Sequence, residues 1–368
     1  MFNETKSEII GSSNLKIPAC DFTYQMEWMG QPVNDIGYWN WSFFVLKGED
    51  GKYHGFGDRV KETDMPMSTR NPKVRDILYG QMKVAEIAHY ISDKPEGPYL
   101  FSNVSLPCTI GEISRAKIFP SIQRCDNKWY MMYTYLRGNE NYSKGEDMRL
   151  CMAVADSLYG PWHDLGTVLE PSSDTANWTY GSKYGVKVGQ MLPFRGKWYA
   201  YFKTWTKAGD FVGVAVADHP EGPWTITEKP AILKDGEHPK TYLEDLGVFQ
   251  WKDKVYIMIM DWNPGYSEWN GGVAGISGAV VLFSSDDGLT FPWDHAKLLV
   301  DQAKYHCPEY DPVKAVNVWG SPNLFAFDTP RTLLIDGKPS YLYFSNGTNI
   351  YGKPASSVYC LKIPEWTI

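Results

Sequence analysis

The chain has 368 residues, of which 43% are hydrophobic and 21% are charged, and its formal net charge is −7. These values are typical of a globular protein and exclude a disordered, fibrous or membrane class. No run of Lys and Arg could neutralise successive phosphates, so we expect no nucleic-acid partner. No stretch approaches the roughly 18 apolar residues of a spanning helix, so we expect no membrane partner.

Cysteine, histidine and the first residues add further expectations. The six Cys lie far apart and form no C-x-x-C pair, which argues against a disulfide scaffold or a zinc site. His54, His89 and His306 have no second ligand at metal-binding spacing, so we expect no metal and no cofactor. Residues 1–10 lack the charged-then-apolar order of a signal peptide. The localisation stays open: cytoplasmic as the chain stands, secreted or periplasmic if a leader was removed.

Five tight turns that lead into apolar strands form one internal repeat, and each has another short strand upstream. In chain order, these upstream strands are predicted at Ser42–Leu46, Phe119–Gln123, Gly189–Phe194, Leu246–Trp251 and Pro322–Phe327. The turns are predicted at Asp50–Tyr53, Asn127–Tyr130, Gly196–Tyr199, Asp253–Tyr256 and Gly337–Tyr341. With 15% aromatic residues, which suit pleated half-buried surfaces, five hairpins predict five repeated β-units.

A second repeat is a Gly-Pro turn that occurs at Ser92–Tyr99, Ala155–Trp162 and Ala217–Trp224. Its shared prolines are 63 and 62 residues apart, a near-constant period that suits radial repetition better than a β-sandwich or two small β-domains. We therefore predict an all-β fold, a five-bladed β-propeller that forms a single domain over residues 1–368. Residues 1–30 should complete the last blade or lie on the surface.

The first strand of each propeller blade lines the axis, so residues at its start converge on one funnel. Trp rings at such positions can stack on sugars, and Lys or Arg can hold a carboxylate or phosphate of the substrate or pair with a funnel acid. The substrate contacts predicted from these positions are Trp39, Arg115, Lys117, Lys187, Gln190 and Trp319.

Carboxylates in such a funnel are what glycoside cleavage requires, because one acid protonates the leaving oxygen and one carboxylate activates water or attacks. Glu244 and Asp35 are the predicted pair, although either could instead cap a turn or form a salt bridge. Asp245 is grouped with Glu244 as a catalytic candidate, but successive side chains alternate along a strand, so only one should face the axis. Glu309 and Asp311, before the fifth blade, are reserve candidates for the base.

The order of these motifs, from the turn at Asp50 to Glu244 and its apolar strand, resembles glycoside hydrolase family 43 and its five-bladed relatives. The resemblance spans most of the chain. It implies a propeller in which an Asp of the first blade is the base, a Glu of the fourth blade is the acid, and a third Asp tunes the acid. Glu244 matches the acid position. The family's base position falls near Asn40 or Ser42, with Asp35 upstream of it, and the third Asp has no counterpart.

The sequence therefore predicts an exo-acting, inverting glycoside hydrolase with a carbohydrate substrate. A non-catalytic carbohydrate-binding propeller is one alternative, because the base and the third Asp depart from the family pattern. A glycoside phosphorylase is another, and would need Arg115, Lys117 and Lys187 to converge on one phosphate site. The sugar, the linkage and the oligomeric state are left open.

Overall fold

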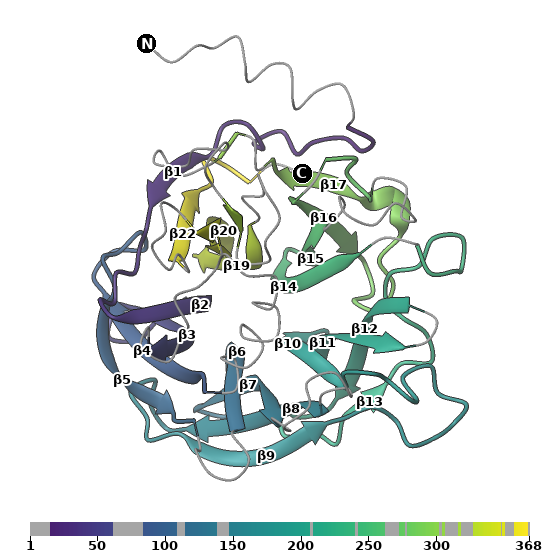
Figure 1. Cartoon of the computed structure of the whole chain (residues 1–368), viewed down its shortest axis with the longest axis horizontal. Helices are drawn as coiled ribbons and strands as arrows, with labels where there is room; N and C mark the ends of the chain where they lie inside the picture. The colour runs from purple at the N-terminus through teal and green to yellow at the C-terminus, as the bar shows by residue number, and fades with distance from the viewer. Residues whose placement is uncertain are drawn as a thin grey trace.

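The structure is a computed structural model of the chain. It describes residues 15–61, 84–108, 115–137, 147–206, 209–239, 242–261, 272–276, 278–301, 304–305, 316–317, 327–346, 348–349 and 357–366. Within this part of the chain, five antiparallel sheets of four strands each are arranged around one central axis (Figure 1). The prediction of an all-β, five-bladed β-propeller is confirmed.

Each of the first four blades is a meander of four consecutive strands, ordered from the axis outward (Figure 1). Blade one contains β2 (Tyr38–Lys47), β3 (Tyr53–Lys61), β4 (Glu86–Ser92) and β5 (Leu100–Leu106). Blade two contains β6 (Arg115–Cys125), β7 (Lys128–Arg137), β8 (Asp147–Ala155) and β9 (His163–Leu169). Blade three contains β10 (Val186–Phe194), β11 (Lys197–Thr206), β12 (Gly209–Ala217) and β13 (Thr225–Ile226). Blade four contains β14 (Leu243–Trp251), β15 (Lys254–Asp261), β16 (Ala279–Ser285) and β17 (Lys297–Val300).

The fifth blade joins segments from opposite ends of the sequence. From the axis outward it contains β19 (Asp328–Ile335), β20 (Lys338–Asn346), β22 (Ser357–Lys362) and β1 (Glu27–Gly30). β1 pairs antiparallel with β22, and Glu27 stands opposite Lys362. Next to this pairing, the rings of Phe22 and Trp366 lie 4.9 Å apart, so the ring of blades is closed by non-covalent contacts.

The inner strand of the fifth blade corrects one prediction. The sequence predicts this strand at Pro322–Phe327, whereas β19 begins at Asp328, and residues 322–326 lie outside the described part of the chain. The sequence at Asp328 and Pro330 has the composition of a turn, because both residue types are frequent in turns and Pro is unfavourable inside a sheet. The structure accommodates Pro330 in a β-bulge, where the register with β20 shifts between Asp328 and Arg331.

Apolar side chains fill the spaces between neighbouring blades. Met132 of blade two, for example, shares a buried cluster with Met191 and Phe202 of blade three. Outside the five sheets, β18 (Val316–Asn317) pairs with β21 (Thr348–Asn349), and a short 3-10 turn, η3 (Trp293–His295), precedes β17. None of the helical segments in the described residues has the length and apolar character needed to traverse a membrane.

Candidate active site

All five inner strands carry the same β-bulge near the axis. In each strand, one non-glycine residue has a positive φ, between 47° and 59°, and the register with the second strand shifts at this point. Because the bulges are alike, the residues beside them occupy equivalent positions around the axis. The bulge residues are Ser42 in β2, Phe119 in β6, Val188 in β10, Asp245 in β14 and Thr329 in β19.

Side chains of the preceding blade accept hydrogen bonds from several bulge amides. A left-handed backbone costs a non-glycine residue on the order of 1–3 kcal/mol, so it persists only where its surroundings stabilise it. These bonds therefore help to fix both the bulges and the packing of one blade against the next. They run from the Ser42 amide to Ser345 Oγ (2.8 Å), from Phe119 to Asp58 Oδ1 (2.8 Å) and from Val188 to Thr134 Oγ1 (2.9 Å).

The residue before each bulge determines the character of the funnel at that blade. These residues, from blade one to blade five, are Trp41, Ile118, Lys187, Glu244 and Asp328. The side chains of Lys187 and Glu244 retain 22% and 21% exposure, whereas Trp41, Ile118 and Asp328 are buried. The polar, accessible part of the funnel therefore lies at blades three and four.

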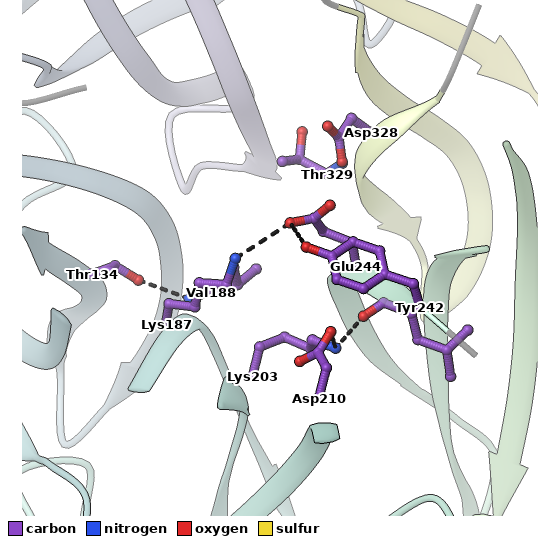
Figure 2. Close-up of polar contacts among 10 residues, drawn as sticks. Thr134, Lys187, Val188, Lys203, Asp210, Tyr242, Glu244, Asp328 and Thr329 are labelled. Atoms are coloured by element: carbon purple, nitrogen blue, oxygen red, sulfur yellow. Dashed lines mark hydrogen bonds and ion pairs between the residues drawn. The ribbon is translucent and has the colours of Figure 1, made fainter. Parts of the chain in front are cut away.

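Glu244, at the head of β14, is held by two polar side chains that point toward it (Figure 2). Lys187 Nζ lies 3.3 Å from Glu244 Oε1, and the Tyr242 hydroxyl donates to the same oxygen at 3.1 Å. The carboxyl group is thus oriented by the protein yet still reachable from the funnel. A group placed in this way can exchange a proton with a bound substrate.

A second ion pair, Lys203 with Asp210, supports the start of β14 from within the core. Their charged atoms are 2.7 Å apart and both side chains are fully buried. Lys203 also donates to the backbone carbonyl of Leu243, the residue before Glu244 (Figure 2). Burial lowers the pKa of Lys203 and raises the pKa of Asp210, while each charge stabilises the other. The pair therefore helps to set the position of Glu244.

Three partly exposed rings, Tyr184, Trp205 and Tyr242, form what we call the aromatic ledge beside Glu244. The ring centroids of Tyr184 and Trp205 are 5.8 Å apart, and those of Trp205 and Tyr242 are 5.7 Å apart. Lys183 lies over the ledge, with Nζ 4.8 Å from the Tyr184 centroid and 5.9 Å from that of Trp205. Exposed aromatic faces next to a carboxyl group suit the stacking of a sugar ring.

Asp245 turns toward the core and forms a hydrogen bond with Asp328 of the fifth blade. Both side chains are almost completely buried. Burial, and then the charge of Asp245, holds the pKa of Asp328 well above its ordinary range, and burial also raises the pKa of Asp245. We assign the shared proton to Asp328, which donates it to the Asp245 carboxylate. A protonated carboxyl group therefore lies within electrostatic range of Glu244.

Arg331, on the inner strand β19, is buried within electrostatic range of this carboxyl pair. Its guanidinium donates to Ser42 Oγ (2.9 Å) and to the carbonyls of Leu246 (2.9 Å) and Pro330 (2.8 Å), so it links blades one, four and five. Burial lowers its pKa to about 10, which still leaves it charged at neutral pH. The carboxyl groups within its electrostatic range belong to Asp58, Asp245 and Asp328.

Asp35 lies in the turn before β2 and is bound to the side chains of blade one. Arg59 Nε donates to Asp35 Oδ2 at 2.7 Å, and the Tyr90 hydroxyl donates to the same oxygen at 2.8 Å. The Arg59 guanidinium in turn lies 3.4 Å from the centroid of the Tyr38 ring. Among the described residues, no hydrogen bond or ion pair joins Asp35 to Glu244.

Of the predicted substrate contacts, Lys187 lies at Glu244, and Trp39 is partly exposed on blade one. The Trp39 ring stacks on Trp41 with centroids 6.2 Å apart. Within the part of the chain that is described, neither indole N–H has a hydrogen-bond acceptor. Both N–H groups are shielded from solvent.

Two other predicted contacts, Lys117 and Gln190, are not brought to Glu244. Lys117 pairs with Asp164 on the outer strand of its own blade at 2.9 Å. Gln190 is buried and donates to the backbone carbonyl of Gly189. The Arg115 side chain, Trp319 and the two reserve acids lie outside the described residues; the reserve acids are Glu309 and Asp311.

No family model matches the chain, and no curated protein matches its sequence. Solved structures do resemble it. Zg3597, a family 117 glycoside hydrolase of the marine bacterium Zobellia galactanivorans, aligns with a TM-score of 0.62 and 15% identity over 92% of this chain and 89% of that one. The GH43_1 enzyme from Xanthomonas citri aligns with a TM-score of 0.52 and 11% identity, over 92% of this chain and 91% of that one. The Bombyx mori GH32 β-fructofuranosidase BmSUC1 aligns with a TM-score of 0.55 and 10% identity, over 92% of this chain and 62% of that one.

The chain has the five-bladed fold of these glycoside hydrolases. The resemblance to family 43 and its relatives is thus confirmed for the fold, and identities this low establish nothing finer. Activity and substrate depend on the side chains that the chain places in its funnel.

Within this propeller, sequence reasoning missed Asp328 and Arg331, and it did not group Trp205 with Tyr184 and Tyr242 as one aromatic ledge. A signal for Asp328 was present in the spacing of the hairpins. Each bulge residue precedes the first residue of its turn by eight positions, as Asp245 precedes Asp253 and Thr329 precedes Gly337. Counting back eight positions from every turn would have located all five bulges. No comparable period points to Arg331 or to the ledge.

Proposed function

We propose that the protein is a glycoside hydrolase in which Glu244 donates a proton to the glycosidic oxygen and Asp35 activates water. The bond between the anomeric carbon and that oxygen breaks, the water oxygen bonds to the anomeric carbon, and Asp35 takes the proton that water loses. The observation that carries the proposal is the environment of Glu244. It is a partly exposed carboxyl group beside an aromatic ledge, with the protonated Asp245–Asp328 pair behind it.

An exo mode of action is supported by the closed centre of the propeller. Arg331 and the five bulge residues, which lie on the inner strands, are all buried. A funnel closed at this depth receives the end of a sugar chain more readily than its middle. We therefore expect release of one or a few sugars from a chain end, which product analysis by chromatography over time would reveal.

We infer inversion because the proposed base, Asp35, would act through a water molecule and not attack the sugar itself. An inverting enzyme needs its carboxyl groups about 6.5–9.5 Å apart so that water fits between them. Arg59 and Tyr90 both bind Asp35 Oδ2, while Oδ1 has no hydrogen bond from the described residues and suits a water molecule. NMR detection of the first anomer released would distinguish inversion from retention.

The decisive variant is Glu244→Gln, which keeps the shape of the side chain but has no proton to donate. General acid catalysis contributes roughly 10²–10⁴-fold, so kcat should fall by that factor in a released-sugar assay on a polysaccharide panel. Glu228→Gln, an exposed Glu of blade three, is the matched control and should keep full activity. Unchanged turnover in the Glu244 variant would remove Glu244 from the mechanism.

The base is tested separately with Asp35→Asn and Asp328→Asn. We expect the Asp35 variant to lose at least about 100-fold in kcat and the Asp328 variant to lose less, because Asp328 is buried and already holds a proton. The reverse order would transfer the role of the base to Asp328.

A non-catalytic carbohydrate-binding propeller is the second candidate. It is favoured by one observation: both proposed acids form ion pairs, Glu244 with Lys187 and Asp35 with Arg59. Saturable binding of oligosaccharides without any released sugar would support it. A phosphorylase is less well supported, because Lys117 pairs with Asp164 instead of joining Lys187.

A further inference from the structure

Three chemically different side chains meet between blades two and three, at the end of the inner strands that lies away from Glu244. Cys125 is the last residue of β6, and Asp126 begins the turn to β7. His219 lies in the turn between β12 and β13 of blade three. Their thiol, carboxylate and imidazole ligand atoms all lie within 4.8 Å of one another. The prediction of no metal rested on spacing along the chain, whereas the packing of two blades brings Cys125 and His219 together across 94 positions.

The separation of the ligand atoms suits a tetrahedral metal ion. Zinc–ligand bonds of about 2.0–2.3 Å at a tetrahedral angle place neighbouring ligand atoms about 3.3–3.6 Å apart. His219 Nε2 lies 3.7 Å from Asp126 Oδ2, so these two atoms already have nearly that separation. The Asp126 side chain is 80% exposed and can move without disturbing the core. Shifts of roughly 1 Å would place all three groups on one ion, with water as the fourth ligand.

Two tight turns hold the ligands near this geometry. Asp126 and Asn127 have positive φ values of 47° and 62°, as in a two-residue hairpin turn, and this turn joins β6 to β7 directly after Cys125. In blade three, the Gly222 amide donates to the carbonyl of His219 at 2.9 Å. Ligands held by such turns lose little conformational freedom when they bind an ion.

Tyr130 of blade two holds the turn that carries His219 against the cluster. The two rings meet edge-on with centroids 5.3 Å apart, and the Tyr130 hydroxyl donates to Glu221 Oε1 at 3.2 Å. The Glu221 amide donates to His219 Nδ1 at 3.3 Å, and Nε2 faces Asp126. An ion at Nε2 moves the ring proton to Nδ1, at the cost of this one long hydrogen bond.

The charges and the donor types at the cluster favour a transition metal. The Cys125 thiol hydrogen-bonds with the Asp126 carboxylate, and Glu221 is also within electrostatic range of the thiol. Both carboxylates would stabilise a divalent cation placed there. Sulfur and imidazole donors suit Zn²⁺ and similar ions, whereas Ca²⁺ and Mg²⁺ prefer oxygen donors alone.

We propose that Cys125, Asp126 and His219 bind a divalent transition-metal ion of the Zn²⁺ type, which links blades two and three. On binding, the thiol releases its proton to solvent and its sulfur bonds to the ion. The Asp126 carboxylate, which interacts with the thiol in the free protein, then also binds the ion. The site is separate from the proposed hydrolase function, because Glu244 lies at the other end of the inner strands.

Titration of the full chain with Co²⁺ tests the site directly. A thiolate bound to Co²⁺ gives an intense charge-transfer absorption in the near ultraviolet. We expect this band to saturate at one ion per chain and to disappear when Zn²⁺ displaces the Co²⁺. If the parent protein gives no such band, the inference is wrong.

Two ligand variants and two controls locate the ion. Cys125→Ser should abolish the band, and His219→Gln should weaken Zn²⁺ binding in calorimetry by at least about 10–100-fold, the loss that follows removal of even a supporting contact. Cys108→Ser, at a partly exposed Cys, and His163→Gln, at an exposed His, lie outside the cluster and should bind as the parent does. If Cys125→Ser keeps the band, or His219→Gln keeps the affinity of the parent, the assigned ligands are wrong.

Thermal melting tests whether the ion links the two blades. Zn²⁺ binds only the folded cluster, so it should raise the Tm of the parent and leave that of Cys125→Ser unchanged. Melting without metal checks that each variant folds. An equal rise in Tm with Ca²⁺ would contradict the choice of a transition metal, and an equal rise in the Cys125 variant would contradict the site.

Discussion

Blades two and four have the same backbone conformation at the axis, but one places an apolar side chain there and the other an acidic one. Phe119 and Asp245 both adopt a positive φ, of 59° and 50°, at a register shift between the first two strands. In blade two the preceding residue is the buried Ile118, and in blade four it is Glu244. The bulge is thus a property of the fold that tolerates an apolar or an acidic residue. The chemistry of the funnel depends on the few side chains placed there.

The charges at the axis are unevenly distributed as a result. Blades three, four and five contribute Lys187, Glu244 and Asp328 before their bulges, whereas blades one and two contribute Trp41 and Ile118. Apolar walls on one side lower the local dielectric, which strengthens every charge interaction on the other side. The same walls raise the free-energy cost of any unpaired charge there, so substitutions that change the charge balance should have large effects.

The largest effect should come from Arg331→Met. Removing this guanidinium leaves the buried carboxyl groups of Asp58 and Asp245 without their shared cation, which typically costs about 3–5 kcal/mol of unfolding free energy. Ile118→Val, at the apolar side of the same axis, is the comparison and should cost only about 0.5–1.5 kcal/mol. Urea denaturation measures both. If both variants lose the same unfolding free energy, the buried charge of Arg331 contributes no more to stability than an apolar side chain at the axis, which contradicts the prediction.

Asp328→Asn should reveal the buried proton through the pH dependence of stability. Burial and Asp245 raise the pKa of Asp328 above its unfolded value, so its contribution is fully present at low pH and is lost as the pH rises. An amide cannot ionise, so this loss should disappear in the variant. The variant should therefore gain stability relative to the parent as the pH rises above 5, by at most about 1.4 kcal/mol per pH unit.

Thermal melting between pH 5 and pH 9 measures this difference. Asp336→Asn, at the exposed turn between β19 and β20, is the matched control and should show no pH-dependent difference. A constant offset between the Asp328 variant and the parent would contradict the assignment of the proton to Asp328.

The fold was predictable from the sequence because its signals are local. The Gly-Pro turns recur at intervals of 63 and 62 residues, hairpin turns such as that at Asp253 recur along the chain, and each turn is specified by a few adjacent residues. The position of Glu244 at the head of an apolar strand was predictable for the same reason, and its catalytic role stays a prediction. The strand in the fifth blade was misplaced because Pro330 sits at a bulge, where a propeller tolerates a residue that most strands exclude.

The rest of the site could not be predicted because it depends on contacts between blades. Asp328 and Asp245 are 83 positions apart in the sequence, and only closure of the ring makes them hydrogen-bond partners. Lys117 was expected in the funnel, but an acid on its own outer strand, Asp164, binds it instead. Partner choice among charged residues depends on distances in space, which the order of residues along a strand does not specify.

The smallest effect should come from Tyr242→Phe, which tests how much one hydrogen bond contributes to the orientation of Glu244. The variant keeps the aromatic ledge but loses the hydroxyl that donates to Glu244 Oε1 at 3.1 Å. One such hydrogen bond is worth about 1 kcal/mol, so kcat should fall roughly three- to tenfold with little change in KM. Tyr180→Phe, at an exposed Tyr, is the control and should leave kcat and KM unchanged. If KM rises instead while kcat is unchanged, the Tyr242 hydroxyl contacts the sugar, and the orientation of Glu244 depends on Lys187 and the Lys203–Asp210 pair alone.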